Sequence, residues 1–416
     1  MRPNARDDRE SGSDSRSLLA EVQEFYERYP YPRPVDSLDD YRARWQDRSR
    51  RRADFHLFWP ASYYKEDHSI LVAGCGTSQA AKHALRWPKA SVTGVDVSAT
   101  SVSCTEGLKR KHDLTNLDVR QLPIERVGEL RKTFDQIVCT GVLHHLADPD
   151  AALRALRDVL ARDGAMQLMV YAPYGRAGVY MLQEFCRLID VPASDDGIRS
   201  LVAALEELPA RHPLAGLLRD APDLRREGAL ADALLHPRDR AYSVPQLFEL
   251  LEGAGLSFGR WVRQAPYSAS CGLMARLPQA AQIGALGPQD QAAAAELFRG
   301  TMTTHSVVAY RNDGPTQTIV FSGDAWLDYV PIRLPDTLCI QERLPPGAAA
   351  VLINRAHTSH DVYLPIDAQE KRLVDSVDDE RCIRDIVGDG RGHRDSARAL
   401  FEKLWRHDQI VFDASR

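Results

Sequence analysis

The sequence lacks the patterns that mark secreted, zinc-binding and membrane-spanning proteins. Its 416 residues include seven cysteines, none of which forms a CxxC pair, so we expect neither a disulfide framework nor a zinc knuckle. No apolar run is long enough to cross a membrane, and no apolar signal segment stands near the first residue. These absences favour a protein of the reducing cytoplasm that has no membrane partner.

An excess of charge of one sign is also missing. The formal net charge of -5, with 27% charged residues, gives no general attraction to nucleic acid. The arginine-rich stretch over 42–52 could contact phosphate, but nearby acids favour a solvated helix face. His357 and His360 have a spacing seen in metal sites, yet no third ligand is evident. We therefore expect no bound metal and regard nucleic acid as a disfavoured partner.

Length and changes of pattern along the chain predict several units. From residue 69, strand-like and helical segments alternate, which is typical of a parallel sheet covered by helices. Strand-like runs at 256–262 and 271–277 are expected to end this α/β unit. The expected units are a disordered tail (1–17), an N-terminal helical lid (18–68), the α/β domain (69–278) with a helical insertion (178–243), a β-rich accessory region (279–365) and a small winged-helix-like module (366–416).

The first strand-like run, ILVAG, ends in a loop that contains Gly74 and Gly76. The dinucleotide fingerprint GxGxxG requires a third glycine, where this chain has Gln79. Asp96 ends the next strand-like run at the distance expected of an acid that binds ribose hydroxyls. The pattern therefore fits an adenosine-bearing ligand, and the missing glycine argues against a pyrophosphate.

A later segment, FDQIVCTGVLHHLADPDAAL over 134–153, decides between such ligands. Together with AGCGT, GVDVS and DVRQLP, it resembles in order and spacing the class I S-adenosylmethionine-dependent methyltransferases. The resemblance covers 69–175 well and extends more loosely to 278. It implies a Rossmann-like α/β fold, S-adenosylmethionine as cofactor, and methyl transfer to an O, N or S nucleophile of a small-molecule or metabolite acceptor. This cofactor has no phosphate, so its loop needs close backbone approach but no third glycine.

The resemblance also implies which residues bind the cofactor. The first glycine loop would line the methionine part, Asp96 would bind the ribose, and Val97 would lie beside the adenine. The segment after the third strand would recognise the adenine edge, and the loop after the fourth would lie near the sulfonium. The expected cofactor-binding residues are Ala73, Gly74, Cys75, Gly76, Asp96, Val97, Asp118, Val119, Gln121, Thr140, Gly141 and Val142.

The candidate catalytic residues are two histidines and two tyrosines. His144 or His145 could be a general base poised near neutral pH. Positioning of the loop explains them equally well, because a sulfonium is already a good leaving group. Tyr26 and Tyr29 could form a lid over the cationic methyl donor, or pack a proline-stiffened strap on the core. Candidate substrate contacts are Tyr171, Tyr174, Arg176, Arg240 and Tyr242.

Two alternatives stay open. The winged-helix-like module could hold a polypeptide, which would make the chain a protein or peptide methyltransferase. The family usually has an acid where this chain has Val72, and often a glycine where it has Ser78. These departures leave a non-catalytic, S-adenosylmethionine-binding regulatory protein as the other alternative.

Overall fold

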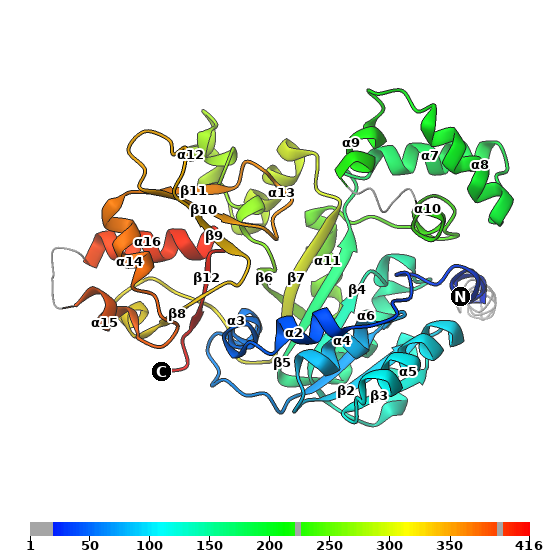
Figure 1. The fold of residues 1–416 in the computed structure, drawn as a ribbon, viewed down its shortest axis with the longest axis horizontal. Coiled ribbons are helices and arrows are strands. Elements are labelled where there is room, and N and C mark those ends of the chain that lie inside the picture. The colour runs from blue at the N-terminus through cyan, green and yellow to red at the C-terminus, as the bar shows by residue number, and fades with distance from the viewer. Residues whose placement is uncertain (1–19, 221–225, 389–393) are drawn as a thin grey trace, which may run out of the picture.

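A sheet of seven strands forms the centre of the molecule, in the order β3-β2-β1-β4-β5-β7-β6 (Figure 1). The computed structural model describes residues 20–220, 226–388 and 394–416, so the expected tail over 1–17 lies outside the described residues. The strands are β1 (Ser69–Ala73), β2 (Ser91–Asp96), β3 (Leu117–Gln121), β4 (Phe134–Thr140), β5 (Leu160–Tyr171), β6 (Leu256–Trp261) and β7 (Thr304–Arg311).

The first five strands are parallel because a helix or a short helical segment carries the chain back between them. Strand β1 is almost completely buried, as expected of a strand that is covered on both faces. Two separate apolar clusters fill the two faces of the sheet. The helices around the sheet are α2 (Asp39–Trp45), α3 (Arg48–Phe58), α4 (Gln79–Arg86), α5 (Ala99–His112), α6 (Pro149–Asp158), α11 (Val244–Gly253), α12 (Ala280–Gly284) and α13 (Pro288–Arg299).

The sheet extends beyond the boundary that the sequence predicts at residue 278. Strand β7 lies between β5 and β6 and is antiparallel to both. The run over 271–277, predicted as a strand, instead forms turns and a short 3-10 helix (Met274–Arg276). Gly272 there has a left-handed backbone (φ 57°), and the next amide donates to Asp361 Oδ2 rather than to a strand. A short apolar run was therefore wrongly predicted as a strand, because the sequence of the run does not show whether a neighbouring strand can pair with it.

The helical insertion follows directly on the end of β5 and lies over the C-terminal ends of the strands (Figure 1). Its helices are α7 (Ala177–Leu188), α8 (Asp195–Glu206), α9 (Pro213–Asp220) and α10 (Glu227–Leu234). Phe25 and Tyr29 belong to the apolar cluster of these helices, and Phe25 lies in a helix over 20–28. The N-terminal segment is thus packed on the insertion and not on the sheet alone.

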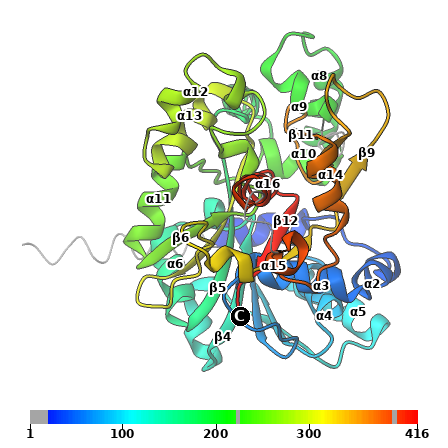
Figure 2. The same cartoon turned by 90° about the vertical axis from the view of Figure 1, so that its left-hand side faces the viewer.

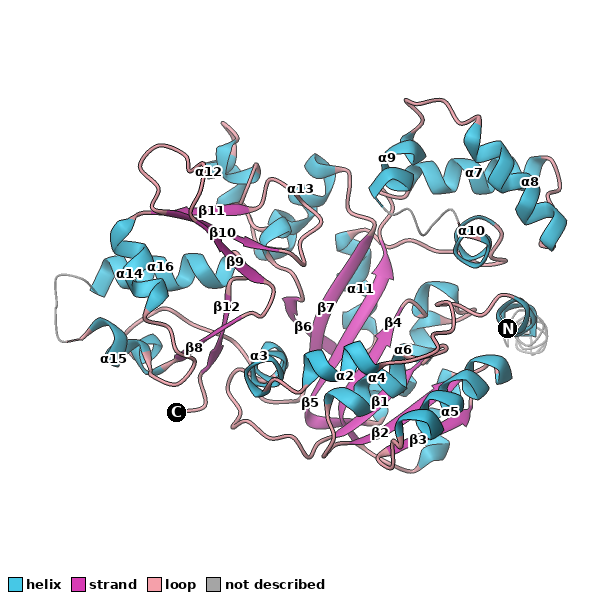
Figure 3. Ribbon diagram, viewed as in Figure 1, coloured by secondary structure: helices cyan, strands magenta, loops and turns pink. Residues whose placement is uncertain are grey.

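The C-terminal region contains two small antiparallel sheets beside the seven-stranded one (Figures 2 and 3). Strand β12 pairs with β8, which precedes residue 366, so the last residues share an apolar cluster with earlier ones. The fold predicted from the sequence, a Rossmann-like sheet with helical insertions and a smaller α+β C-terminal region, is confirmed. The elements are β8 (Val330–Arg333), β9 (Thr337–Ile340), β10 (Ala350–Asn354), β11 (Tyr363–Ile366), α14 (Ala368–Asp375), α15 (Ile383–Val387), α16 (Arg394–Arg406) and β12 (Ile410–Asp413).

Within the described ranges, no helix has both the length and the apolar character needed to cross a bilayer.

Candidate active site

A cavity of about 1690 Å³ lies at the C-terminal ends of the parallel strands, beneath the inserted helices. Ligands of open α/β sheets bind at this edge, where the crossover connections leave a crevice. The cavity is larger than the roughly 300–1,000 Å³ of an ordinary ligand pocket. It therefore has room for a cofactor and a second molecule.

The glycine loop after β1 forms one wall of the cavity. Gly74 and Gly76 both have left-handed backbones, with φ of 69° and 52°, a conformation that glycine adopts without steric cost. A Cβ atom on Gly74 would lie 2.3 Å from Val142 Cγ2, which belongs to the loop after β4. The two loops are thus in direct contact, and both line the cavity.

Asp96 forms the next part of the wall, at the end of β2. Its carboxylate accepts hydrogen bonds from the Gly76 N–H (2.8 Å) and the Ser98 N–H (3.0 Å). Burial raises the pKa of this carboxyl above its ordinary value, and the backbone hydrogen bonds act in the opposite direction. A carboxylate accepts about four hydrogen bonds, so Asp96 keeps accepting capacity toward the cavity. Leu122 and Ile124 add an apolar surface nearby.

The N-terminal segment closes over the glycine loop. Thr77 Oγ1 donates a hydrogen bond to the Pro32 carbonyl (2.7 Å), and a Cβ on Gly76 would meet Pro32 Cδ at 3.0 Å. Glu27 accepts hydrogen bonds from the N–H groups of Ala99 and Thr100, the first residues of α5. A carboxylate at a helix N-terminus is favourable because it satisfies unpaired N–H groups. The segment is therefore held over the cavity at two points.

Another part of the cavity wall contains a buried carboxylate, Asp232 of α10. Tyr26 OH donates to Asp232 Oδ1 (3.0 Å), and Tyr171 OH donates to Asp232 Oδ2 (3.3 Å). No basic side chain of the described residues lies within ion-pair distance of this carboxylate, which is only 3% exposed. Burial raises the pKa of Asp232, and it raises the pKa of both tyrosines well above the ordinary value.

Arg176 lines the same cavity, but its positive charge is already paired with Asp239. Its guanidinium lies 3.5 Å from the centre of the Tyr171 ring and forms an ion pair of 2.9 Å with Asp239. Gln183 donates to the same Asp239 oxygen (2.9 Å). Arg176 therefore holds the Tyr171 ring in place.

The two histidines after β4 have different surroundings. His145 lines the cavity, and its Nδ1 lies 2.7 Å from the Arg238 carbonyl. His144 is buried outside the cavity, stacked on the Tyr171 ring at 3.7 Å between centroids. Neither of its ring nitrogens has a hydrogen-bond partner among the described residues. Burial lowers its pKa well below the ordinary value, which makes it a weak base. His144 also lies outside the cavity lining, so it does not suit a general base.

Several other candidates also lie away from the cavity lining. Asp118 pairs with Arg120 at the surface, and Gln121 donates to the Val97 carbonyl. Tyr174 and Arg240 are exposed, whereas Tyr242 is buried in the core. The candidates absent from the lining are Ala73, Cys75, Asp118, Val119, Gln121, His144, Tyr174, Arg240 and Tyr242. The candidates in the lining are Tyr26, Tyr29, Gly74, Gly76, Asp96, Val97, Thr140, Gly141, Val142, His145, Tyr171 and Arg176.

Sequence reasoning missed Asp232, Leu122 and Ile124. Asp232 interrupts the apolar helical run GALADALL over 228–235, and an acid within an apolar run is the one signal that could have revealed it. Leu122 and Ile124 lie only one and three residues beyond Gln121, where the sequence expects the adenine contacts.

The fold and cavity define an open α/β protein with a large cavity at its strand ends. Residues 71–166 match the family described as a methyltransferase domain. An uncharacterized protein of Synechococcus sp. is 31% identical over 262 residues, which cover 58% of this chain and 60% of that protein. The (S)-coclaurine N-methyltransferase of Thalictrum flavum is 26% identical over 27% of this chain and 32% of its own length. The chain thus spans less than two thirds of each of these curated relatives.

Among solved structures, PKMT2 from Rickettsia typhi superposes with a TM-score of 0.61 at 16% identity, over 88% of this chain and 75% of its own. Residues 71–166 are thus a methyltransferase domain, and the likeness in fold extends over most of the chain. The family and the cofactor class predicted from the sequence are confirmed.

Proposed function

We propose that the chain transfers a methyl group from S-adenosylmethionine to the amine nitrogen of a small metabolite. The main support is that one cavity contains both the glycine loop with Asp96 and the buried carboxylate of Asp232. The first set of residues suits the methyl donor, and the second suits a cationic acceptor. A volume of about 1690 Å³ accommodates both molecules.

The glycine loop and Asp96 fit an adenosine group. The left-handed glycines allow close backbone approach, and Asp96 would accept hydrogen bonds from the ribose hydroxyls. Val97, Leu122 and Ile124 offer an apolar surface to the adenine. S-adenosylmethionine, when bound, supplies an electrophilic methyl group on a positively charged sulfur.

Asp232 favours an amine among the possible acceptors. Asp232 forms no ion pair with a described residue, and the nearby His145 and Arg176 offset only part of the effect of its burial on its pKa. A buried carboxylate without a paired charge is costly, and an amine, which is protonated in water with a pKa of about 10.4, would supply that charge. Before it can attack, the amine nitrogen must lose a proton. We propose that the Asp232 carboxylate, which accepts hydrogen bonds from the Tyr26 and Tyr171 hydroxyls, takes that proton. Its raised pKa makes it a stronger base.

The test combines binding with transfer of a labelled methyl group. Calorimetry should detect binding of S-adenosylmethionine and of S-adenosylhomocysteine to the purified protein. Label from methyl-labelled S-adenosylmethionine should enter amine-containing small molecules of a fractionated extract. Asp232→Asn should lower the transfer rate by about 10²- to 10⁴-fold and retain cofactor binding. The matched control is Glu207→Gln, which replaces an exposed acid at the end of α8.

Two results would contradict the proposal. Failure to bind either cofactor form would remove the methyltransferase assignment. Transfer that is unchanged in Asp232→Asn, or label that enters hydroxyl or thiol acceptors only, would remove the amine assignment.

A lysine side chain of a protein is a second candidate acceptor, because its amine has the same chemistry. PKMT2 is a protein lysine methyltransferase, and its likeness in fold extends beyond the methyltransferase domain to 88% of this chain. Label that migrates with protein bands on a denaturing gel, rather than with small molecules, would favour this candidate.

A further inference from the structure

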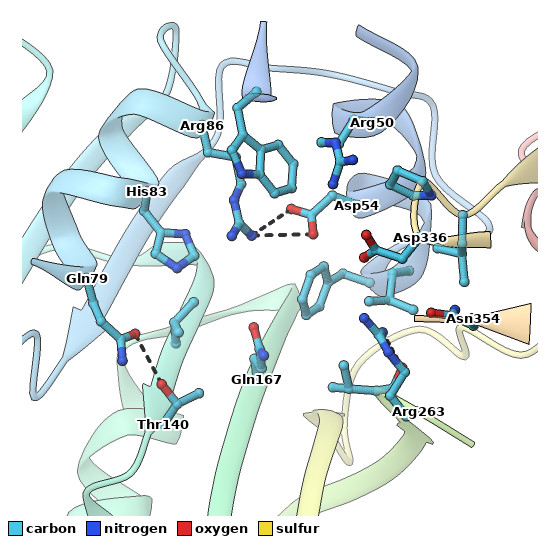
Figure 4. Close-up of a pocket in the computed structure, with 17 residues that line it drawn as sticks. Arg50, Asp54, Gln79, His83, Arg86, Thr140, Gln167, Arg263, Asp336 and Asn354 are labelled. Carbon is cyan, nitrogen blue, oxygen red and sulfur yellow. Dashed lines mark hydrogen bonds and ion pairs between the residues drawn. The ribbon is translucent and has the colours of Figure 1, made fainter. Parts of the chain in front are cut away.

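A second cavity, of about 300 Å³, lies beside the sheet at a junction of three parts of the chain (Figure 4). Helices α2 and α3 contribute from the N-terminal part, and α4, β4 and β5 from the methyltransferase domain. The third side is made by the segments after β6 and β8 and by the end of β10. With about 30 Å³ per water molecule, the cavity would hold roughly ten waters, or one small metabolite.

The charged groups that line this cavity leave one positive charge in excess. They are three guanidiniums (Arg50, Arg86, Arg263) and two carboxylates (Asp54, Asp336). Arg86 and Asp54 neutralise each other through an ion pair of 3.0 Å. Arg50 and Arg263 form no ion pair with any residue that the structure describes. A ligand with a single negative charge would therefore balance the lining.

Two uncharged polar side chains at the cavity also lack partners among the described residues. His83 is 6% exposed, and its Nδ1 is buried without a hydrogen-bond partner. Burial lowers its pKa well below the ordinary value, so the ring is neutral and can donate one hydrogen bond. Gln167 lies in the middle of β5, and its side chain makes no hydrogen bond within the described ranges. A buried polar group is costly when unpaired, which suits His83 to a ligand; Gln167 is half-buried, and its amide is free to bond to a ligand in the cavity.

Besides the polar side chains of Gln79, Thr140 and Asn354, the lining has an apolar patch made by Leu57 and Phe58 from α3 and Val138 from β4. This surface would favour a ligand with an apolar body as well as a charged end.

We propose that this second cavity binds a small monocarboxylate with an apolar or aromatic body, its carboxylate directed toward Arg50 and Arg263. The cavity is separate from the cofactor site but adjoins it. Thr140 Oγ1 donates to Gln79 Oε1 at 3.2 Å (Figure 4), and both side chains line both cavities. A ligand in the second cavity therefore changes the affinity for the cofactor, and the effect is reciprocal.

The test uses benzoate as the probe and the full chain as the protein. Calorimetry with benzoate at millimolar concentration, without any cofactor, should show saturable binding with one site per chain. Benzamide, the neutral analogue, should bind at least about tenfold more weakly, because it lacks the charge that the arginines pair with. Inorganic phosphate should bind no better than benzamide, since it has no apolar body.

Two variants and a control locate the site. Arg263→Gln and Arg50→Gln should each weaken benzoate binding by about tenfold while S-adenosylhomocysteine still binds. Arg48→Gln, on the exposed side of the same helix as Arg50, should leave benzoate binding unchanged. Because benzoate is titrated without cofactor, these results do not depend on methyl transfer.

Absence of saturable benzoate binding, or equal binding to the wild type and Arg263→Gln, would overturn the site. An S-adenosylhomocysteine affinity that is identical with and without saturating benzoate would overturn the coupling.

Discussion

Replacement of Gly74 by alanine tests whether contact between two loops shapes the cofactor site. The backbone at Gly74 has φ of 69°, and an added Cβ would lie 2.3 Å from Val142 Cγ2. No real Cβ contact is that short, so either the glycine loop or the loop after β4 must move. Because both loops line the cavity, the cost should appear in cofactor affinity as well as in stability.

The cost has a conformational part and a packing part. A non-glycine residue in the left-handed region costs about 1–2 kcal/mol, and overpacking against Val142 costs about 1–3 kcal/mol. We therefore expect Gly74→Ala to lower the free energy of unfolding by about 2–5 kcal/mol in total. If the loops move apart, S-adenosylhomocysteine binding should fall as well, by at least about tenfold.

Urea denaturation and calorimetry measure the two effects. Gly107→Ala is the matched control, because it lies inside α5 and an added Cβ there meets nothing within 4 Å. Alanine is favoured over glycine in a helix by about 1 kcal/mol, so this control should be neutral or stabilising.

The double variant Gly74→Ala/Val142→Ala separates the two parts of the cost. Removing the valine methyl groups should restore about 1–3 kcal/mol, the packing part, and leave the conformational part. A Gly74→Ala protein with wild-type stability and affinity, or a double variant with no recovery, would refute the inferred contact.

Three further predictions concern groups around the site and the core. Asp96→Ala should weaken S-adenosylhomocysteine binding by roughly tenfold or more, whereas Asp118→Ala, outside the cavity lining, should bind normally in the same titration. Glu27→Gln should lower the free energy of unfolding by about 1 kcal/mol and speed proteolysis of the N-terminal segment, and unchanged cleavage would count against its capping role. Burial lowers the pKa of His56 and of His68 to about 4, so the stability that each contributes is complete above the unfolded pKa near 6.5 and is lost as pH falls toward 4. The free energy of unfolding from urea denaturation should thus fall between pH 6.5 and 5.5 by about 1 kcal/mol per histidine, and by less in His68→Leu; a flat profile would contradict this.

Local patterns were enough to predict the parallel half of the sheet. Strands such as β1 and β4 are buried on both faces and therefore read as continuous apolar runs. The order of the C-terminal strands was not predictable in this way. One partner of β7 is β5, more than 130 residues earlier, and the sequence of a short strand does not indicate so distant a neighbour.

In the candidate site, too, some residues were predictable from local patterns and others were not. Gly74, Gly76 and Asp96 could be predicted from the sequence, because each belongs to a local strand-and-loop pattern. The two glycines adopt left-handed backbones, and Asp96 accepts a hydrogen bond from the Gly76 N–H. Neither His144 nor His145 is distinguished by spacing, yet only His145 lines the cavity. The chain turns between them in a short 3-10 helix over 143–145, so the two adjacent rings point in different directions.

The sequence by itself determined the class of the protein, the loop that suits its cofactor and the absence of a third glycine that a pyrophosphate would need. Only the tertiary structure brought Tyr26, Tyr171 and Asp232 together from three separate segments, up to 206 residues apart. It also joined the N-terminal helices, the sheet and the C-terminal region around the second cavity. The physical reason is that a turn or a strand is encoded by adjacent residues, whereas the charge and shape of a cavity arise from side chains whose neighbours are set by packing.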